Sequence, residues 1–324
     1  MVAGSDSGRG AHGALREQLE AIAREMARES ERGTIRPGDD DSRLGAFGIA
    51  VSTRDGALLQ AGDAAEPFPI QSISKVFALM LALEQAGEGI WERVGREPSG
   101  DPYNSIMDLE RHRGHPRNPF INAGALVIDD ILLGLWPESE GVIEPVREKL
   151  AALIGRQPAL DGRVLASLEA GHVNRALAHL AKSFDNLHHA VDAVMAVYVH
   201  QCAVSLTCAE LALAGRPLMV EKLGGEEKLT ADEVRLARRI NALMLTCGQY
   251  DGSGEFAYRV GLPAKSGVSG GILAIVPNTA SIAVWSPGLD ETGNSRIGTR
   301  ALACLAEAMD WSIFGASGLP DDRL

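Results

Sequence analysis

Ser72 and Lys75 stand three residues apart in the stretch FPIQSISKVF, residues 68–77, where an apolar run begins. On a helix this spacing puts two side chains on one face, with their Cβ atoms roughly 5–6 Å apart. A serine hydroxyl is a strong nucleophile only when a base takes its proton, and a lysine is such a base only when it is uncharged. The apolar flanks of Lys75 favour the uncharged amine, and the amino end of the helix offers N–H groups to a developing oxyanion. The pair therefore predicts a Ser-x-x-Lys acyl-transfer centre.

A second lysine motif supports this interpretation. Lys265-Ser266-Gly267 lies in the glycine-rich apolar stretch PAKSGVSGGILAIVP, residues 263–277. In Ser-x-x-Lys hydrolases a Lys-Thr/Ser-Gly triplet lies on a strand beside the nucleophile, where it adds positive potential and backbone N–H groups. The alternative is that Ser72 caps a helix, Lys75 is a snorkelling side chain and the triplet is an ordinary strand entry. The two motifs together favour a hydrolase.

Two of the four tyrosines are further candidates. Tyr250 lies in the glycine-rich segment TCGQYDGSGEFA, and Tyr198 lies in the helical segment AVYVHQC. A phenol at position 250 could relay a proton between the nucleophile and a leaving group. The simpler alternative for each tyrosine is a packing residue with a satisfied hydroxyl.

The elements that must position these groups predict an α+β fold. Leu15, Leu19, Ile22 and Met26 form a helical stripe near the amino terminus, and Asp55-Gly56 separates two strand-like segments as in a hairpin. Residues 105–245 have mostly helical patterns, and residues 255–287 contain short β-rich runs before a last helix. We expect one antiparallel sheet, built from strands of both ends of the chain and flanked by helices, together with a central helical lobe.

The predicted domain organisation follows from this pattern. Residues 1–13 are expected to be disordered, and residues 316–324 to form a tail. A single domain is expected over 14–315, with its sheet part at 14–70 and 246–315 and its helical part at 71–245.

Composition excludes several classes of protein. The chain has 324 residues, of which 45% are hydrophobic, and a formal net charge of −12. It has no basic stripe for nucleic acid, no apolar run suited to a bilayer and no segment typical of a secretory signal. The four cysteines lie in apolar surroundings without metal-ligand spacing, which fits reduced thiols in a cytoplasmic protein that binds no metal.

Five stretches resemble the serine-dependent glutaminases: FPIQSISKVF, PSGDPYNS, RNPFINAGAL, LTCGQYDGSGEFAYRVGLPAKSGVSGGILAIVP and IAVWSPGLDETGNS. The resemblance covers roughly residues 44–310 and implies a serine β-lactamase-like fold. It implies an amidohydrolase that converts L-glutamine and water to L-glutamate and ammonia through a γ-glutamyl-serine intermediate, without a cofactor. It also implies a homodimer or homotetramer.

The resemblance assigns roles residue by residue. Ser72 would be the nucleophile, Lys75 its base and Tyr250 the active-site tyrosine. Further substrate-binding positions, among which Val268 would give its N–H to the oxyanion hole, are Asn122, Asn174, Tyr198 and Val268. Lys265 would contribute positive potential without binding substrate.

The sequence departs from the family pattern near the expected amino-acid site. Val173 stands where the family has arginine, and Ser167 stands where it has a glutamate. Glu169 is the nearest carboxylate, and it is either the ammonium ligand or an ordinary solvated helix charge. The family's Tyr-Ile-Pro segment before the first strand is missing from GTIRPGDDDS, residues 33–42.

Two other functions remain open at this point. One is a penicillin-interacting hydrolase, although the chain lacks Ser-Asp-Asn and Tyr-x-Asn triplets. The other is a diverged family member with weak or no glutaminase activity that acts as a binding scaffold.

Overall fold

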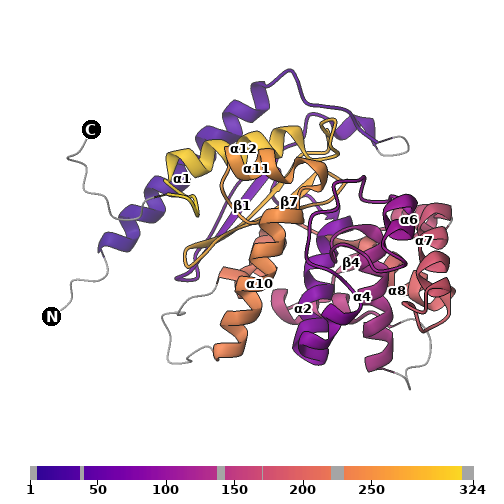
Figure 1. The fold of residues 1–324 in the computed structure, drawn as a ribbon. Helices are drawn as coiled ribbons and strands as arrows, with labels where there is room; N and C mark the ends of the chain where they lie inside the picture. The colour runs from indigo at the N-terminus through magenta and orange to yellow at the C-terminus, as the bar shows by residue number, and fades with distance from the viewer. Residues whose placement is uncertain (1–5, 37–39, 137–142, 170, 220–229, 316–324) are drawn as a thin grey trace.

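A five-stranded antiparallel sheet is the central element of the fold (Figure 1). The computed structural model describes residues 6–36, 40–136, 143–169, 171–219 and 230–315. The strand order is β2-β1-β8-β7-β6. The strands are β1 (Gly48–Thr53), β2 (Leu58–Gly62), β6 (Ala264–Ser266), β7 (Gly271–Val276) and β8 (Ala280–Trp285).

The sheet joins the two ends of the chain, as the sequence predicts. Strands β1 and β2 form the expected hairpin, and Gly56 in its turn has a φ of 95°, which glycine adopts without steric cost. On its other side β1 pairs with β8, with Ala50 opposite Ala283. The α+β prediction, with an antiparallel sheet built from both ends of the chain, is therefore confirmed.

Two terminal helices cover one face of this sheet (Figure 1). They are α1 (Asp6–Arg28) and α12 (Arg296–Ala308). The predicted stripe of α1, from Leu15 to Met26, is fully buried against the sheet. The helix begins at Asp6, within the segment 1–13 that the sequence predicts to be disordered, because extending a formed helix costs far less than nucleating one. Residues 1–5 and 316–324 lie outside the described residues.

The opposite face packs against the helical part of the chain. In Figure 1, α10 (Ala231–Cys247) lies directly below the sheet, and α2 (Ser74–Ala86) lies beside α10, toward the other helices. Helix α10 begins with the predicted capping box of Thr230 and Glu233. The remaining helices are α3 (Ile106–Arg111), α4 (Asn122–Leu135), α5 (Pro145–Ile154), α6 (Gly162–Glu169), α7 (His172–Ser183), α8 (Val191–Ala203) and α9 (Cys208–Ala214). Short 3-10 turns are η1 (Asp41–Arg43), η2 (Gln71–Ile73), η3 (Gly87–Glu92), η4 (Arg216–Met219) and η5 (Tyr250–Gly252).

Two segments differ from their expected secondary structure. The pattern of residues 190–215 predicts continuous helix, but β5 (Val204–Leu206) interrupts it and forms a small sheet with β3 (Phe68–Pro69) and β4 (Ala159–Leu160). The interruption is stabilised by a capping box of Thr207 and Glu210, which starts α9 as a new helix. Residues 255–259 were expected in a β-rich run but belong to α11 (Ser253–Arg259), because Phe256 and Val260, one turn apart, both pack into the core above the sheet.

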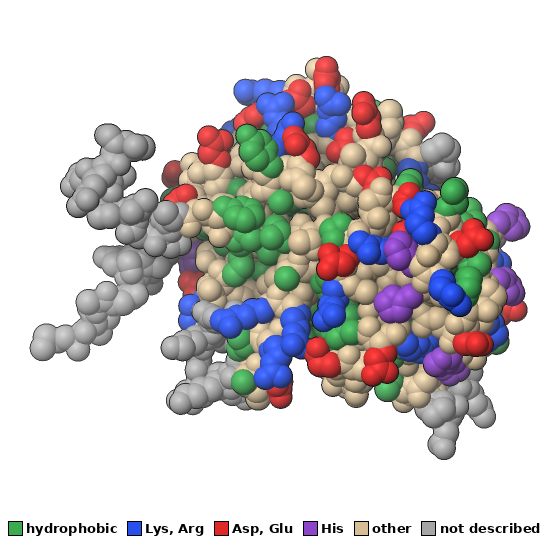
Figure 2. Space-filling view, in the orientation of Figure 1, with side chains coloured by type: hydrophobic (Ala, Val, Ile, Leu, Met, Phe, Trp, Pro, Cys, Tyr) green, Lys and Arg blue, Asp and Glu red, His purple; other side chains and the backbone are tan. Residues whose placement is uncertain are grey.

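The surface has mixed charge. Figure 2 shows acidic and basic side chains interspersed over the visible face of the described residues. Within the same described ranges, every helix is too short or too polar to cross a bilayer.

Candidate active site

The Ser72 turn connects the small sheet to the central helix. Ser72 lies in η2 between β3 and α2, so the pair Ser72–Lys75 spans the junction of a 3-10 turn and an α-helix. Gln71, directly before the serine, has a φ of 49°, a conformation that non-glycine residues seldom adopt. Backbone strain of this kind is concentrated at functional sites. Ser72 keeps only 8% of its surface exposed.

Lys75 is buried and points at two oxygen acceptors. Its Nζ donates to Asn122 Oδ1 at 2.7 Å and to the carbonyl oxygen of Phe120 at 3.3 Å. Burial lowers the pKa of Lys75 to about 8, against the opposing effects of Cys202 and Asp129. An appreciable fraction of this lysine is therefore the free amine near neutral pH.

Asn122 connects Lys75 to two other expected site residues. It is the first residue of α4, and its Nδ2 donates to Asn174 Oδ1 at 2.9 Å. The hydroxyl of Tyr198, from α8, donates to Asn122 Oδ1 at 3.3 Å. The structure thus brings Lys75, Asn122, Asn174 and Tyr198 into one hydrogen-bonded chain.

Tyr250, on η5 between α10 and α11, lies close to the serine. Its φ is 51°, and its hydroxyl donates to the carbonyl oxygen of Ser266 at 3.3 Å and is also a hydrogen-bond partner of Ser72. Burial raises the pKa of Tyr250, so the phenol is uncharged at neutral pH. Lys265 lies under this phenol, with its Nζ 4.4 Å from the ring centroid and 2.7 Å from the same Ser266 carbonyl oxygen.

The turn after β6 packs directly on the Ser72 turn. A Cβ on Gly267 would lie 2.5 Å from the carbonyl oxygen of Ile70, so only glycine allows this approach. Val268 follows in the turn between β6 and β7 and is half-buried. Its N–H has no acceptor among the described residues. The arrangement places a backbone donor at the edge of the Ser72 turn.

Two positions where the sequence departs from the family pattern fall on α6 and α7. Glu169 is the last residue of α6, and its side chain lies outside the described residues. Val173, the residue in place of the family arginine, is 44% exposed. Within the described ranges no group of three His, Cys, Asp or Glu side chains could hold a metal ion.

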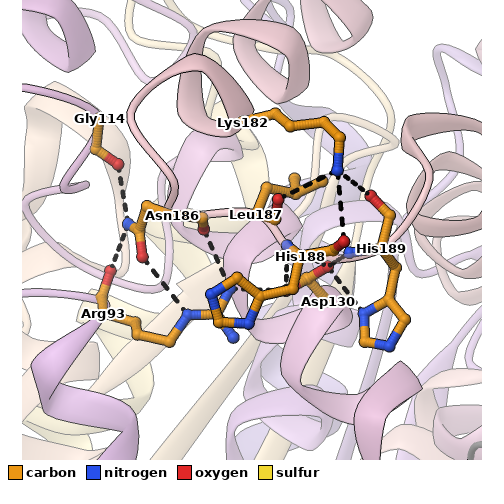
Figure 3. A network of polar contacts seen from close by, with 8 residues as sticks. All are labelled: Arg93, Gly114, Asp130, Lys182, Asn186, Leu187, His188 and His189. Carbon is orange, nitrogen blue, oxygen red and sulfur yellow. Dashed lines mark hydrogen bonds and ion pairs between the residues drawn. The ribbon is translucent and has the colours of Figure 1, made fainter.

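A polar network holds the segment that connects α7 to α8 in place (Figure 3). The buried carboxylate of Asp130 pairs with Arg93 at 2.6 Å and accepts from the backbone N–H groups of His188 and His189. Burial alone would raise the pKa of Asp130, but the hydrogen bonds from His189, Arg93 and His188 hold it below its usual value. Lys182 donates to the carbonyl oxygens of residues 187, 188 and 189. The network holds the helices that carry Asn174 and Tyr198.

Comparisons with known proteins agree with this geometry. The family model described as Glutaminase matches residues 41–314. The chain belongs to the glutaminase family. A glutaminase of Mesorhizobium japonicum is 52% identical over 309 residues, which cover 93% of this chain and 96% of the relative. A glutaminase of Agrobacterium fabrum is 54% identical over 271 residues, covering 83% and 88% respectively.

Solved structures of glutaminases have the same fold. A Bacillus glutaminase crystallised in 4.3 M NaCl matches with a TM-score of 0.81 and 36% identity, covering 93% of this chain and all of that one. The Bacillus subtilis glutaminase YbgJ, in a covalent complex formed with 6-diazo-5-oxo-L-norleucine, matches with a TM-score of 0.77 and 34% identity over 92% of this chain and 99% of that one. The predicted family, β-lactamase-like fold and amidohydrolase function of this glutaminase are confirmed.

Sequence reasoning missed two contributors to the site of this glutaminase, the Phe120 carbonyl oxygen and Asp129, and one buried neighbour, Asp130. The Phe120 acceptor is a backbone carbonyl, which no side-chain motif reveals. Asp129 and Asp130 are fully buried, although carboxylates are seldom buried unless they are paired. Two adjacent acids inside the apolar stretch ALVIDDILL were the signal that could have identified them.

Proposed function

We propose that this glutaminase hydrolyses L-glutamine through a γ-glutamyl ester of Ser72. Ser72 Oγ attacks the side-chain carboxamide carbon while its proton passes to Lys75 Nζ. The tetrahedral intermediate expels ammonia, and water then hydrolyses the ester to give L-glutamate and free Ser72. The net reaction consumes one water and releases one ammonia.

The contacts of Lys75 support its role as the base. A neutral amine has two hydrogens and one lone pair. Asn122 Oδ1 and the Phe120 carbonyl oxygen accept the two hydrogens, which leaves the lone pair for the Ser72 hydroxyl. Burial favours the neutral amine, and the two acceptors orient it. These two effects come from different elements of the fold, so both are preorganised before substrate arrives.

Groups on the sheet side of the site are proposed to stabilise the oxyanion and to protonate the leaving group. The N–H groups of Ser72 and Val268 are the proposed donors to the oxyanion, since Ser72 lies in the first turn of its helix and Val268 in a turn beside it. Tyr250, which is uncharged and hydrogen-bonded to Ser72, is the proposed relay that protonates the departing ammonia. Lys265 adds positive potential below the phenol.

The helical side is proposed to bind the amino-acid head group. Asn122, Asn174 and Tyr198 offer both donors and acceptors, which a zwitterion requires. Glu169 is proposed as the ammonium ligand.

The observation that carries this proposal is the buried Lys75 amine held beside the Ser72 turn by two acceptors. The test is ammonia release from glutamine by the wild type, Ser72→Ala and Ser52→Ala. Ser52 is also buried but lies in β1, away from the site. We expect release by the wild type and Ser52→Ala and none by Ser72→Ala. A wild type that binds glutamine without releasing ammonia would instead support the scaffold function.

We also propose a cytoplasmic homodimer or homotetramer. All four cysteines are free, which suits a reducing compartment. Ile106 and Met107 on α3 are 42% and 68% exposed, and apolar side chains of this size at a surface suit a subunit contact. Light scattering during gel filtration would give the assembly, and a monomer at micromolar concentration would refute this part.

A further inference from the structure

Helix α4 presents two polar residues on the face toward Lys75. Asn122 and Asp129 are seven residues, or two turns, apart and therefore share a side of the helix. Asp130, the next residue, is rotated by about 100° and joins the network of Figure 3 instead. The two adjacent buried carboxyls therefore lie in two different surroundings.

Helix α8 matches this face with a second pair. Tyr198 and Gln201 are three residues apart, so they too share a side of their helix. Tyr198 donates to Asn122 Oδ1 at 3.3 Å, and Gln201 Nε2 donates to Asp129 Oδ2 at 3.1 Å. The two hydrogen bonds join α4 and α8 at two separate points.

The groups around Asp129 are too few to stabilise an isolated negative charge on its carboxyl. Its side chain is fully buried, and its Oδ1 has no hydrogen-bond partner among the described residues. Gln201 gives a single donor, whereas Asp130 receives Arg93 and two backbone N–H groups. A lone buried carboxylate with one donor is costly unless a cation compensates it. Burial raises the pKa of Asp129, and the nearby Lys75 charge lowers it. The Asp129 charge in turn raises the pKa of Lys75.

Other titratable groups face the same amine from the elements packed around it. Cys202, from α8, has a thiol whose pKa burial raises to about 11, so it is uncharged. The Tyr198 ring centroid lies 5.8 Å from Lys75 Nζ, and burial raises the pKa of this tyrosine as well. Burial, and then the nearby Lys75 charge, lower the pKa of Lys265. Tyr250, on η5, is an uncharged phenol. Asp129 is therefore the carboxyl of this group, and Asp130 behind it is already compensated by Arg93.

We propose that Asp129 is a positioning residue that, from the face of α4 that carries Asn122, acts through its charge on Lys75 and so sets the pH range in which the amine is free. The proposal rests on the proposed role of Lys75 as base. The pair Lys75-ammonium with Asp129-carboxylate holds the same number of protons as the pair Lys75-amine with Asp129-carboxylic acid. When Asp129 is ionised, its negative charge stabilises the Lys75 ammonium. Lys75 then stays protonated to a higher pH than it would if burial acted alone.

The test is the pH dependence of kcat/KM for glutamine, measured on the wild type, Asp129→Asn and Asp130→Asn. Removing the Asp129 charge removes the attraction on the ammonium, so the acid limb of Asp129→Asn should move to lower pH by about one unit. Asp130→Asn is the matched control, because it removes the neighbouring buried carboxyl that faces away from Lys75. Its acid limb should stay at the wild-type position, whatever the height of the profile.

A second variant covers the case in which Asp129→Asn does not fold. Gln201→Met removes the donor to Asp129 Oδ2 and makes ionisation of Asp129 harder, so its acid limb should also move to lower pH. The proposal would be overturned if the acid limb of Asp129→Asn stayed in place. If Asp129→Asn is unfolded, an unmoved acid limb in Gln201→Met would overturn it in the same way. An equal shift in Asp130→Asn would also overturn it. A wild type with no ammonia release, or with no acid limb, would instead refute the proposed function.

Discussion

Lys75 combines two features that oppose each other in most proteins. A lysine with oxygen acceptors at 2.7 and 3.3 Å is normally a stable ammonium, whereas a fully buried lysine is normally driven to the neutral form. Here burial lowers the pKa to about 8, so the ammonium predominates at pH 7 and the free amine predominates only above pH 8. The side chain is therefore oriented like a cation while it can act as a base.

The first prediction concerns the pH dependence of the wild type. A base must be unprotonated, so kcat/KM should rise about tenfold per pH unit in acid and level off above the Lys75 pKa of about 8. The measurement is steady-state ammonia release over this range at constant ionic strength. A limb centred near pH 4–5, roughly where carboxylates titrate, would assign the base to an acidic residue instead.

Some groups of the site could be predicted from the sequence, and others could not. Ser72, Lys75 and the Lys265 triplet follow from type and spacing, because local motifs carry their own chemistry. The Phe120 carbonyl and the Asp129–Gln201 pair depend on α4 and α8 lying side by side, which no local pattern reveals.

At the scale of elements, the site depends on a close approach between two turns. The turn after β6 lies against the Ser72 turn because Gly267 has no Cβ to meet the Ile70 carbonyl oxygen. The strained φ angles of Gln71 and Tyr250 flank the same contact. Small displacements there would separate the proposed Val268 donor from the oxyanion.

Gly267→Ala should therefore lower kcat strongly. A Cβ 2.5 Å from the Ile70 carbonyl oxygen forces the turns apart, and losing one oxyanion donor costs about 100-fold or more in kcat. The control is Gly254→Ala, since a Cβ at Gly254, in α11, has nothing within 4 Å. Wild-type kcat in Gly267→Ala, with glutamine kinetics measured side by side, would contradict the proposed oxyanion geometry.

The network of Figure 3 gives a prediction on stability. Asp130→Asn leaves Arg93 without its buried partner, so the free energy of unfolding at neutral pH should fall by about 3 kcal/mol. Because the folded-state pKa of Asp130 is lowered, its stabilisation is present above its unfolded pKa and is lost as pH falls through the lower folded value. The difference between variant and wild type should shrink in acid.

Urea unfolding at several pH values measures this difference. Asp192→Asn is the matched control, because Asp192 also pairs with an arginine but has a side chain that is 86% exposed. Equal effects of the two substitutions would show that the Asp130 network does not stabilise the fold.

Element boundaries show where sequence reasoning fails. The Asp-Gly hairpin and the apolar stripe of α1 were predictable, because each has a strong periodic or turn signal. Strand β5 was not, because its three residues are paired with the distant segments β3 and β4. Helix α11 was hidden by aromatic and β-branched residues that the core above the sheet accepts on a helix.

At the scale of the whole molecule, one core connects the sheet with the helical part. The same buried cluster contains Leu273 and Ala283 of the sheet, Val76 of α2 and Ile128 of α4. Trp285, at the end of β8, stacks on Phe68 just before the Ser72 turn, with ring centroids 5.6 Å apart. We therefore propose that residues 14–315 form a single cooperative unit.

This proposal predicts one unfolding transition. Urea curves from tryptophan fluorescence and from far-ultraviolet circular dichroism should coincide, because the sheet and the helical part cannot separate without exposing their shared core. Two resolved transitions would show that the two parts are independent domains.

The central claim is that Ser72 becomes covalently bonded to the substrate carbon, and covalent labelling tests it most directly. The chain would be treated with 6-diazo-5-oxo-L-norleucine, the reagent that forms the covalent complex of the Bacillus subtilis relative. Peptide mass spectrometry should find a single adduct on Ser72, suppressed by excess glutamate and absent from Ser72→Ala. An adduct on another residue, or equal labelling of Ser72→Ala, would contradict the account.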